Sequence, residues 1–248
     1  MTEDRLRSLT DTVVVVTGAG AGIGAALTEQ LLAAGARVVA GELRPELLDP
    51  VVQRWGADRV VVCGGDIGDP ATAGALIATG VATWGRVDSV VANAGVGFFG
   101  GLLDYSIEQT ALMVNTNLLG TIWLARAAIE RYREQGAGGD IVITASVAGL
   151  GYGSGQESVY AATKAAQLQF ATSLDREVRR EGIRVSVVAP AAVNTGFAVA
   201  TGRFGDTPFE EGPFMRPADI AYALLTCLRQ PRALRTGLWQ LQALVEEI

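Results

Sequence analysis

A glycine-rich segment directly after a buried strand is the feature that most constrains this chain. Residues 13–16 are four consecutive valines, a β-branched run that is typical of a strand covered on both faces. The run leads into TGAGAGIG at residues 17–24, where glycines remove the Cβ atoms that would block a tight turn. An Ala- and Leu-rich helix is expected over residues 22–34, with its free N–H groups pointing at the loop. The sequence therefore predicts a strand, a turn and a helix that form a pyrophosphate site.

The rest of the chain repeats the alternation of β-rich and helical stretches. Strands are expected over residues 37–40, 59–63, 87–92, 140–144 and 184–189, and residues 236–241 are a candidate seventh strand. Helices are expected over residues 46–55, 71–84, 107–135 and 160–181, the third broken near Asn115. This rhythm requires parallel strands joined by right-handed crossovers. It predicts an α/β fold: a doubly wound Rossmann-like domain with a mostly parallel six- or seven-stranded sheet and helices on both faces.

Domain boundaries are not visible in the sequence. We find no Ser/Pro-rich linker, charge block or short-period repeat, so residues 1–248 are interpreted as a single dinucleotide-binding and catalytic domain. The exception to the regular rhythm is the segment 194–217, which is rich in Gly, Pro and Phe and has little periodicity. Irregular segments of this length inside a domain are usually functional lids or mobile loops, so we interpret this one as a substrate loop.

Composition excludes several classes of protein. The net charge of -6 argues against a nucleic-acid surface, no apolar run reaches the ~18 residues of a membrane span, and the N-terminus does not resemble a secretory signal. The chain contains no histidine, which excludes His-based triads, HExxH metal sites and a His proton shuttle. Cys63 and Cys227 lack CxxC partners and are expected to be reduced thiols. We therefore expect a cytoplasmic protein with no metal, nucleic-acid or membrane partner.

An acidic residue at the end of the second strand bears on the choice of dinucleotide. Glu42 lies 18 positions after Gly24, where a carboxylate can accept hydrogen bonds from both adenosine ribose hydroxyls and would repel a 2′-phosphate. Ala21 and Leu43 occupy the places where Arg or Lys would indicate a phosphate-bearing cofactor. The sequence thus favours NAD, while Arg44, one position further on, keeps NADP as the less favoured alternative.

The segment YAATK places Tyr160 and Lys164 four residues apart, on one face of the expected helix. A free tyrosine has a pKa of about 10, and lowering it by about three units requires roughly 4 kcal/mol of preferential interaction. The lysine ammonium and the positive charge of an oxidised nicotinamide are suitable sources of that interaction. Ser146 ends the fifth strand and Asn93-Ala94-Gly95 follows the fourth, at the sheet edge that faces the ligand crevice.

Taken together, these segments resemble the short-chain dehydrogenase/reductase family of the Tyr-x-x-x-Lys type. The resemblance rests on the glycine loop, the acid after the second strand, Asp66-Ile67, the NAG at 93–95, Asn117, Ser146 and YxxxK, in the family's order and approximate spacing from about residue 10 to 195. It implies that Tyr160 is the general acid/base, that Lys164 lowers the Tyr160 pKa and binds the nicotinamide ribose, and that Ser146 orients the substrate oxygen. Asn117 would hold a water in a proton relay, with Asn115 as a weaker competitor.

The same resemblance implies a set of cofactor contacts. Asp66 and Ile67 would contact adenine, residues 93–95 would line the cofactor, and Val193 and Thr195 would contact the nicotinamide carboxamide. The full set of predicted cofactor-binding residues is Thr17, Gly18, Ala21, Gly22, Ile23, Gly24, Glu42, Asp66, Ile67, Asn93, Ala94, Gly95, Tyr160, Lys164, Pro190, Val193 and Thr195.

Three departures from the family pattern are visible. Pro190 is followed by Ala191 rather than glycine, the interval from Ser146 to Tyr160 is 160 − 146 = 14 positions where 13 is usual, and the C-terminus lacks the usual Asp-Gly-Gly. The extra residue lies at the expected substrate entrance and predicts an atypical pocket wall.

The resemblance implies an NAD-dependent oxidoreductase that interconverts a secondary alcohol and a ketone. The alternatives are an NADPH-dependent biosynthetic ketoreductase and, more remotely, a non-catalytic dinucleotide-binding regulator. Expected substrate contacts are Ser146, Tyr160, Phe98 and Gln156, and further apolar residues lie in the segment 194–217. The partner would be a small alcohol or ketone, whose identity the sequence leaves open, and a homodimer or homotetramer is expected by resemblance.

Overall fold

The computed structural model describes residues 6–153, 155–197 and 214–244. Within them, a seven-stranded sheet has the order β3-β2-β1-β4-β5-β6-β7, and every neighbouring pair of strands is parallel. This confirms the predicted doubly wound α/β fold and the candidate seventh strand. The strands are β1 (Val13–Thr17), β2 (Arg37–Glu42), β3 (Val60–Gly64), β4 (Ser89–Ala92), β5 (Gly139–Thr144), β6 (Ile183–Pro190) and β7 (Leu238–Leu241).

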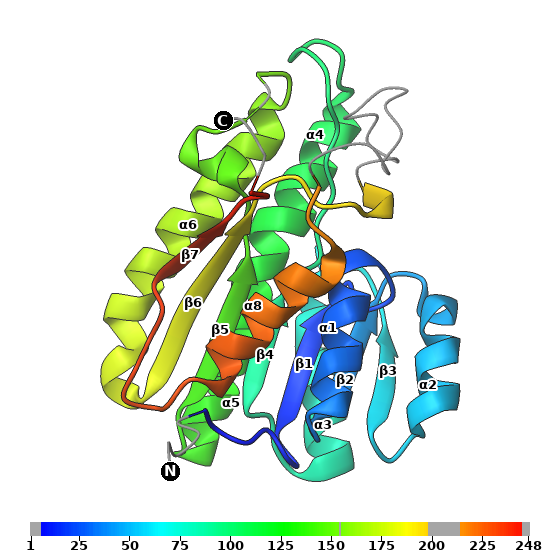
Figure 1. The fold of residues 1–248 in the computed structure, drawn as a ribbon, viewed down its shortest axis with the longest axis vertical. Helices are drawn as coiled ribbons and strands as arrows, with labels where there is room; N and C mark the ends of the chain where they lie inside the picture. Colours follow the sequence, from blue (N-terminus) through cyan, green and yellow to red (C-terminus); the bar gives the residue numbers. More distant parts are fainter. Residues whose placement is uncertain (1–5, 154, 198–213, 245–248) are drawn as a thin grey trace.

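Helices cover both faces of the sheet (Figure 1). One apolar cluster joins the sheet to α1 and α8, and a second joins its other face to α3, α5 and α6. The central strands β1, β4, β5 and β6 are buried along their whole length, as expected for parallel strands that have helices on both faces of the sheet. The helices are α1 (Gly22–Ala33), α2 (Asp49–Trp55), α3 (Pro70–Trp84), α4 (Ile107–Met113), α5 (Gly120–Gln135), α6 (Ser158–Val178) and α8 (Pro217–Arg229).

The predicted break near Asn115 is confirmed and has a specific form. A π-helical turn over Val114–Leu119 separates α4 from α5, and such turns occur frequently at functional sites. Helix α8, in contrast, was not predicted from the sequence. It begins with Pro217 at its first position and buries Ile220, Leu224 and Leu228 at helical spacing beside α1.

The irregular segment 194–217 is described only at its two ends. Val193 and Met215 form an isolated parallel bridge, and the Asn194 N–H donates to the Met215 carbonyl at 2.9 Å, so the two ends meet beside β6. Residues 198–213, which include Phe204, Phe209 and Arg203, lie outside the described residues.

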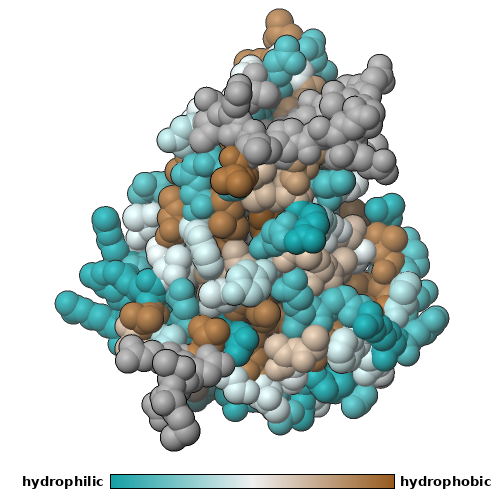
Figure 2. Space-filling view, in the orientation of Figure 1, coloured by the Kyte–Doolittle hydropathy of each residue, from teal (hydrophilic) through white to brown (hydrophobic). Residues whose placement is uncertain are grey.

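Polar and apolar surface are mixed over the molecule. In the view of Figure 2, brown apolar side chains are scattered over the centre of the face, and hydrophilic side chains project from its lower left edge. None of the described helices is long and apolar enough to cross a membrane.

Candidate active site

A cavity of about 550 Å³ lies at the carboxyl edge of the sheet, where the strand order reverses between β1 and β4. In open α/β sheets this crevice is where ligands bind. Its walls come from the turns that follow β1, β2, β4, β5 and β6, and from helix α6. Fifteen residues predicted from the sequence line it: Gly18, Ala21, Gly22, Ile23, Glu42, Asn93, Ala94, Gly95, Phe98, Ser146, Tyr160, Lys164, Pro190, Val193 and Thr195.

The glycine loop adopts the conformation that its sequence demands. Gly18 and Gly22 have φ values of 64° and 51°, in the left-handed region that favours glycine. Gly24 packs so tightly that a Cβ there would collide with the Gly18 carbonyl oxygen. The N-cap residue Ala21 offers no side-chain cap to the first turn of α1, so the N–H groups at this cavity-lining end remain available to an anionic group.

Thr17 and Asn93 connect this loop to the turn after β4. The Thr17 hydroxyl accepts hydrogen bonds from the backbone N–H groups of Asn93 and Ala94, both at 3.1 Å. The Asn93 amide donates in return to the Thr17 carbonyl at 3.1 Å. Thr17 is therefore a buried support of the cavity rather than part of its lining.

Glu42 lines the cavity beside the glycine loop. Its carboxylate accepts a hydrogen bond from the Gly20 N–H at 2.9 Å and another from the Leu43 N–H at 3.0 Å. These bonds hold an acceptor group at the position where the sequence places the adenosine ribose. Arg44 also lines the cavity. The site therefore contains both a carboxylate that would repel a 2′-phosphate and a guanidinium that would attract one.

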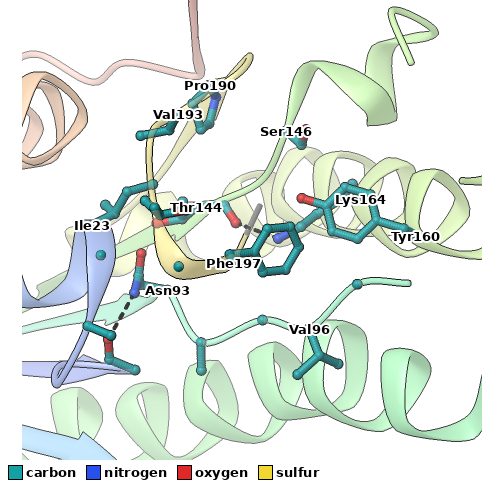
Figure 3. Close-up of a pocket in the computed structure, with 18 of the residues that line it drawn as sticks. Ile23, Asn93, Val96, Thr144, Ser146, Tyr160, Lys164, Pro190, Val193 and Phe197 are labelled. Atoms are coloured by element: carbon teal, nitrogen blue, oxygen red, sulfur yellow. Dashed lines mark hydrogen bonds between the residues drawn. The ribbon is translucent and has the colours of Figure 1, made fainter. Parts of the chain in front are cut away.

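Tyr160 and Lys164 reach from α6 toward the same space, as Figure 3 shows. The Lys164 Nζ lies 5.7 Å from the centre of the Tyr160 ring and donates to the Thr144 carbonyl at 2.9 Å. Lys164 is the only lysine in the sequence and is 3% exposed. Burial lowers its pKa from the ordinary 10.5 to about 7, because an ammonium is poorly solvated there.

Ser146 lines the cavity from the end of β5 and is buried. Its hydroxyl accepts a hydrogen bond from the Ala148 N–H at 3.2 Å, which caps a short 3₁₀ turn over Val147–Leu150. The residues after this turn include Gly151 and Gly155, both with positive φ. The longer interval between Ser146 and Tyr160 is thus accommodated in the connection, and both side chains still meet the cavity.

Asn117 lies in the π-helical turn, fully buried and outside the cavity lining. Its side chain accepts from the Val96 N–H and donates to the Val96 carbonyl, both at 2.8 Å, and donates to the Thr163 hydroxyl at 3.0 Å. Asn117 therefore ties the cavity wall at Val96 to the helix that carries Tyr160. The competing Asn115 is exposed.

Gln167 completes this network, and sequence reasoning missed it. Its amide nitrogen donates to the Asn117 carbonyl and to the Thr121 hydroxyl, both at 2.7 Å. The Asn117 carbonyl also accepts from Thr121 at 2.8 Å, so two side-chain donors already occupy it. A signal was available, because Tyr160, Thr163, Lys164 and Gln167 share one face of the helix.

Three other predicted residues are not part of the cavity lining. Asp66 is exposed and accepts from the Gly68 N–H at 2.8 Å, and Ile67 packs in the core beside Gly120. Gln156 is exposed, and its carbonyl accepts from the Gly100 N–H at 2.8 Å. Within the described part of the chain, no group of three or more potential metal-ligating residues is present.

Comparisons with known proteins agree with this geometry. The family model described as short chain dehydrogenase matches residues 12–203. An uncharacterized oxidoreductase of Staphylococcus aureus (strain USA300) is 33% identical over 224 residues, 90% of this chain and 94% of the relative.

Two solved structures share the fold at 26% identity. The 3-ketoacyl-(acyl-carrier-protein) reductase of Brucella melitensis, complexed with NADH, has a TM-score of 0.85 and covers 95% of this chain and 98% of its own. The alcohol dehydrogenase of the archaeon Thermococcus sibiricus, complexed with 5-hydroxy-NADP, has a TM-score of 0.83 and covers 96% and 98%. The chain described here belongs to the short-chain dehydrogenase/reductase family and is an oxidoreductase.

Proposed function

We propose that this protein is an NAD-dependent oxidoreductase that interconverts a secondary alcohol and a ketone, with Tyr160 as general acid/base. The observation that carries the proposal is the meeting of Ser146, Tyr160 and Lys164 in the cavity that the glycine loop also lines. The uncapped start of α1 and the Glu42 carboxylate suit the pyrophosphate and ribose of a dinucleotide. When bound, NAD would supply the hydride acceptor for oxidation and, reduced, the donor for the reverse reaction.

The roles of the protein's own groups follow from their chemistry. In the oxidation direction, the Tyr160 phenolate would accept the hydroxyl proton of the alcohol, and in reduction the phenol would return it to the oxygen. The nearby Lys164 ammonium would stabilise the phenolate electrostatically and lower the Tyr160 pKa. Ser146 would orient the substrate oxygen. A non-catalytic regulator is disfavoured because such proteins usually lose one of these three residues.

Tyr160→Phe tests this mechanism, because it removes only the hydroxyl. We expect turnover to fall by about 10³-fold, within the range for loss of a general acid/base, with NAD affinity unchanged in a binding titration. Tyr222→Phe is a matched control, because Tyr222 lies exposed on helix α8 and outside the cavity lining. Full turnover by the Tyr160 variant would refute the assignment.

A biosynthetic NADPH-dependent ketoreductase is the second candidate, and Arg44 at the cavity is the observation that favours it. We favour NAD because the Glu42 carboxylate would repel a 2′-phosphate. Glu42→Ala is expected to weaken NAD use and improve NADP use, measured as kcat/KM for each cofactor with the same substrate. Unimproved NADP use together with unchanged NAD binding would show that Glu42 does not select the cofactor.

We further propose one dinucleotide-binding and catalytic domain over residues 1–248, acting in the cytoplasm as a homodimer or homotetramer. The described strands form a single sheet with apolar clusters on both faces, which supports the first point. Light scattering coupled to size-exclusion chromatography measures the oligomeric state, and a mass of one chain would contradict a homodimer or homotetramer.

A further inference from the structure

The part of the cavity around Tyr160 is more apolar than the end lined by the glycine loop, Glu42 and Arg44. Met113, Ala148 and Tyr160 form a separate buried apolar cluster, against which Val96, Phe98 and Phe197 pack. Two of the flanking rings lie close to Tyr160: the ring centroid of Phe197 is 5.7 Å away and that of Phe99 is 6.1 Å away, both tilted. The Tyr160 ring is therefore a close neighbour of two phenylalanine rings that come from two different turns.

Gly97 makes the close approach of Phe197 possible. A Cβ at position 97 would lie 2.7 Å from the Phe197 Cζ and 3.1 Å from the Tyr160 Cδ2, so any larger residue would push the two rings aside. Figure 3 shows Phe197 beside Tyr160 and Lys164. The absence of a side chain at position 97 lets the turn after β6 place an aromatic ring against the turn after β4, next to the reacting group.

Charge is distributed unevenly along the cavity. Among the described lining residues, the charged ones are Glu42, Arg44 and Lys164, and the first two lie at the end of β2. Lys164 already donates to the Thr144 carbonyl and faces Tyr160. The described wall near Phe98 and Phe197 thus offers no cation to a carboxylate or phosphate on the substrate, and burying an unpaired charge there would cost free energy.

We propose that the substrate is an uncharged ketone or secondary alcohol whose reacting carbon bears a flat apolar ring, with Phe197 and Phe98, which both line the cavity, as specificity-determining residues. The ring would pack among these phenylalanines while the oxygen meets Ser146 and Tyr160. Aromatic side chains give both apolar contact and a preferred tilted or offset geometry, which suits a planar group better than a flexible chain. This inference rests on the proposed function.

The test compares a neutral probe with its charged analogue on the same protein. For wild type, kcat/KM is measured for 1-phenylethanol and for 4-(1-hydroxyethyl)benzoate with NAD. The Kd values of acetophenone and 4-acetylbenzoate are measured by calorimetry on the NAD-loaded protein, because oxidised NAD cannot reduce a ketone and the complex does not react. We expect the neutral member to be favoured by about 100-fold in both measurements, because the carboxylate would be buried without a partner. Equal or better use and binding of the carboxylates would overturn the inference.

Phe197→Leu tests the ring contact itself. We expect kcat/KM for 1-phenylethanol to fall by about 10-fold, mainly through KM, while kcat/KM for 2-butanol changes by less than about twofold. Phe170→Leu is the matched control, since Phe170 lies on α6 but packs against the sheet core, outside the cavity. An equal loss for both alcohols would show that Phe197 does not select for a ring.

The two measurements separate this inference from the proposed function. If no alcohol or ketone is turned over but NAD-loaded protein still binds acetophenone better than 4-acetylbenzoate, the proposed reaction fails and the specificity stands. If turnover occurs and charged probes are preferred, the reaction stands and the specificity fails. If acetophenone does not bind at all, the specificity is refuted.

Discussion

Replacing Lys164 by methionine should stabilise the protein while abolishing its activity, and the gain should depend on pH. In the folded state the Lys164 pKa is about 7, against 10.5 for an ordinary lysine. The unfolded chain therefore binds more protons than the folded one between about pH 7 and 10.5, so the contribution of this group to stability rises with pH across that window. Below pH 7 Lys164 is charged in the folded state, and the full free-energy cost of burying that charge is present. The gap between the two pKa values corresponds to about 5 kcal/mol, at about 1.36 kcal/mol per pKa unit.

The net effect of Lys164→Met is smaller than that upper limit. The variant also loses the hydrogen bond to the Thr144 carbonyl, which costs about 1.5–3 kcal/mol for a charged donor. We expect the variant to be more stable than wild type by about 2 kcal/mol at pH 7. Between pH 7 and pH 9 the unfolded lysine stays largely protonated while the folded one loses its proton, so this advantage should shrink by about 2 kcal/mol.

Equilibrium urea unfolding at pH 7, 8 and 9 measures the difference, with cofactor-free protein at one fixed concentration. Gln169→Met is the matched control, because Gln169 is exposed on the same helix and its stability difference from wild type should not change with pH. Because the chain has a single lysine, ε-¹³C-lysine labelling gives one signal that reports the Lys164 pKa directly. A stability gap that is constant from pH 7 to 9, or a lysine signal that titrates near pH 10, would refute the reasoning.

Three further predictions concern the supports of the fold and the site. Asp140 is buried and forms ion pairs with Arg7, Arg184 and Arg232, so Asp140→Ala should lower the free energy of unfolding in urea by about 3–5 kcal/mol. Asp219→Ala, at an exposed ion pair, should lower it by about 0–1 kcal/mol. Equal losses of stability in the two variants would contradict this prediction. Gln167→Leu removes a donor to the Asn117 carbonyl and should lower kcat by about 10-fold with NAD affinity unchanged, in steady-state kinetics and a binding titration. Gly24→Ala should weaken NAD binding by more than about 10-fold in the same titration, because the alanine Cβ would collide with the Gly18 carbonyl and push α1 away from the loop. Unchanged NAD affinity would contradict the proposed pyrophosphate site.

Much of the fold could be predicted from the sequence, because the local residue pattern of most elements matches the environment that the folded protein gives them. The valines of β1 lie in a strand buried on both faces, and Gly18 and Gly22 after them take the positive φ values that glycine adopts more easily than other residues. The break near Asn115 was also predicted from the sequence, but its π-helical form was not. Helix α8 was not predicted, although Pro217 and the apolar spacing after it are signals, because no predicted strand directly precedes it and the strand–helix alternation therefore does not extend to it.

The site was readable only in part, because several of its residues act through contacts that no spacing reveals. Asn117 was predicted, but its link to Val96 and to Gln167 joins segments that are far apart in the chain. Phe98 was an expected substrate contact and Phe197 lies in the segment interpreted as a substrate loop, yet whether a phenylalanine faces a cavity or the loop interior depends on how two turns pack. Asp66 and Ile67, in contrast, lie outside the cavity lining.

By itself, the sequence determined the strand–helix rhythm, the glycine loop and the helix face that carries Tyr160 and Lys164, because these features depend on backbone sterics and on periodicities of a few residues. Only the tertiary structure decided the environment of that face. It buried the single lysine deeply enough to lower its pKa to about 7, and it set Phe197 against Gly97 beside the phenol. Desolvation and ring contacts depend on atoms from distant segments, so Tyr160 becomes a candidate acid/base with a distinct apolar setting only once the chain is folded.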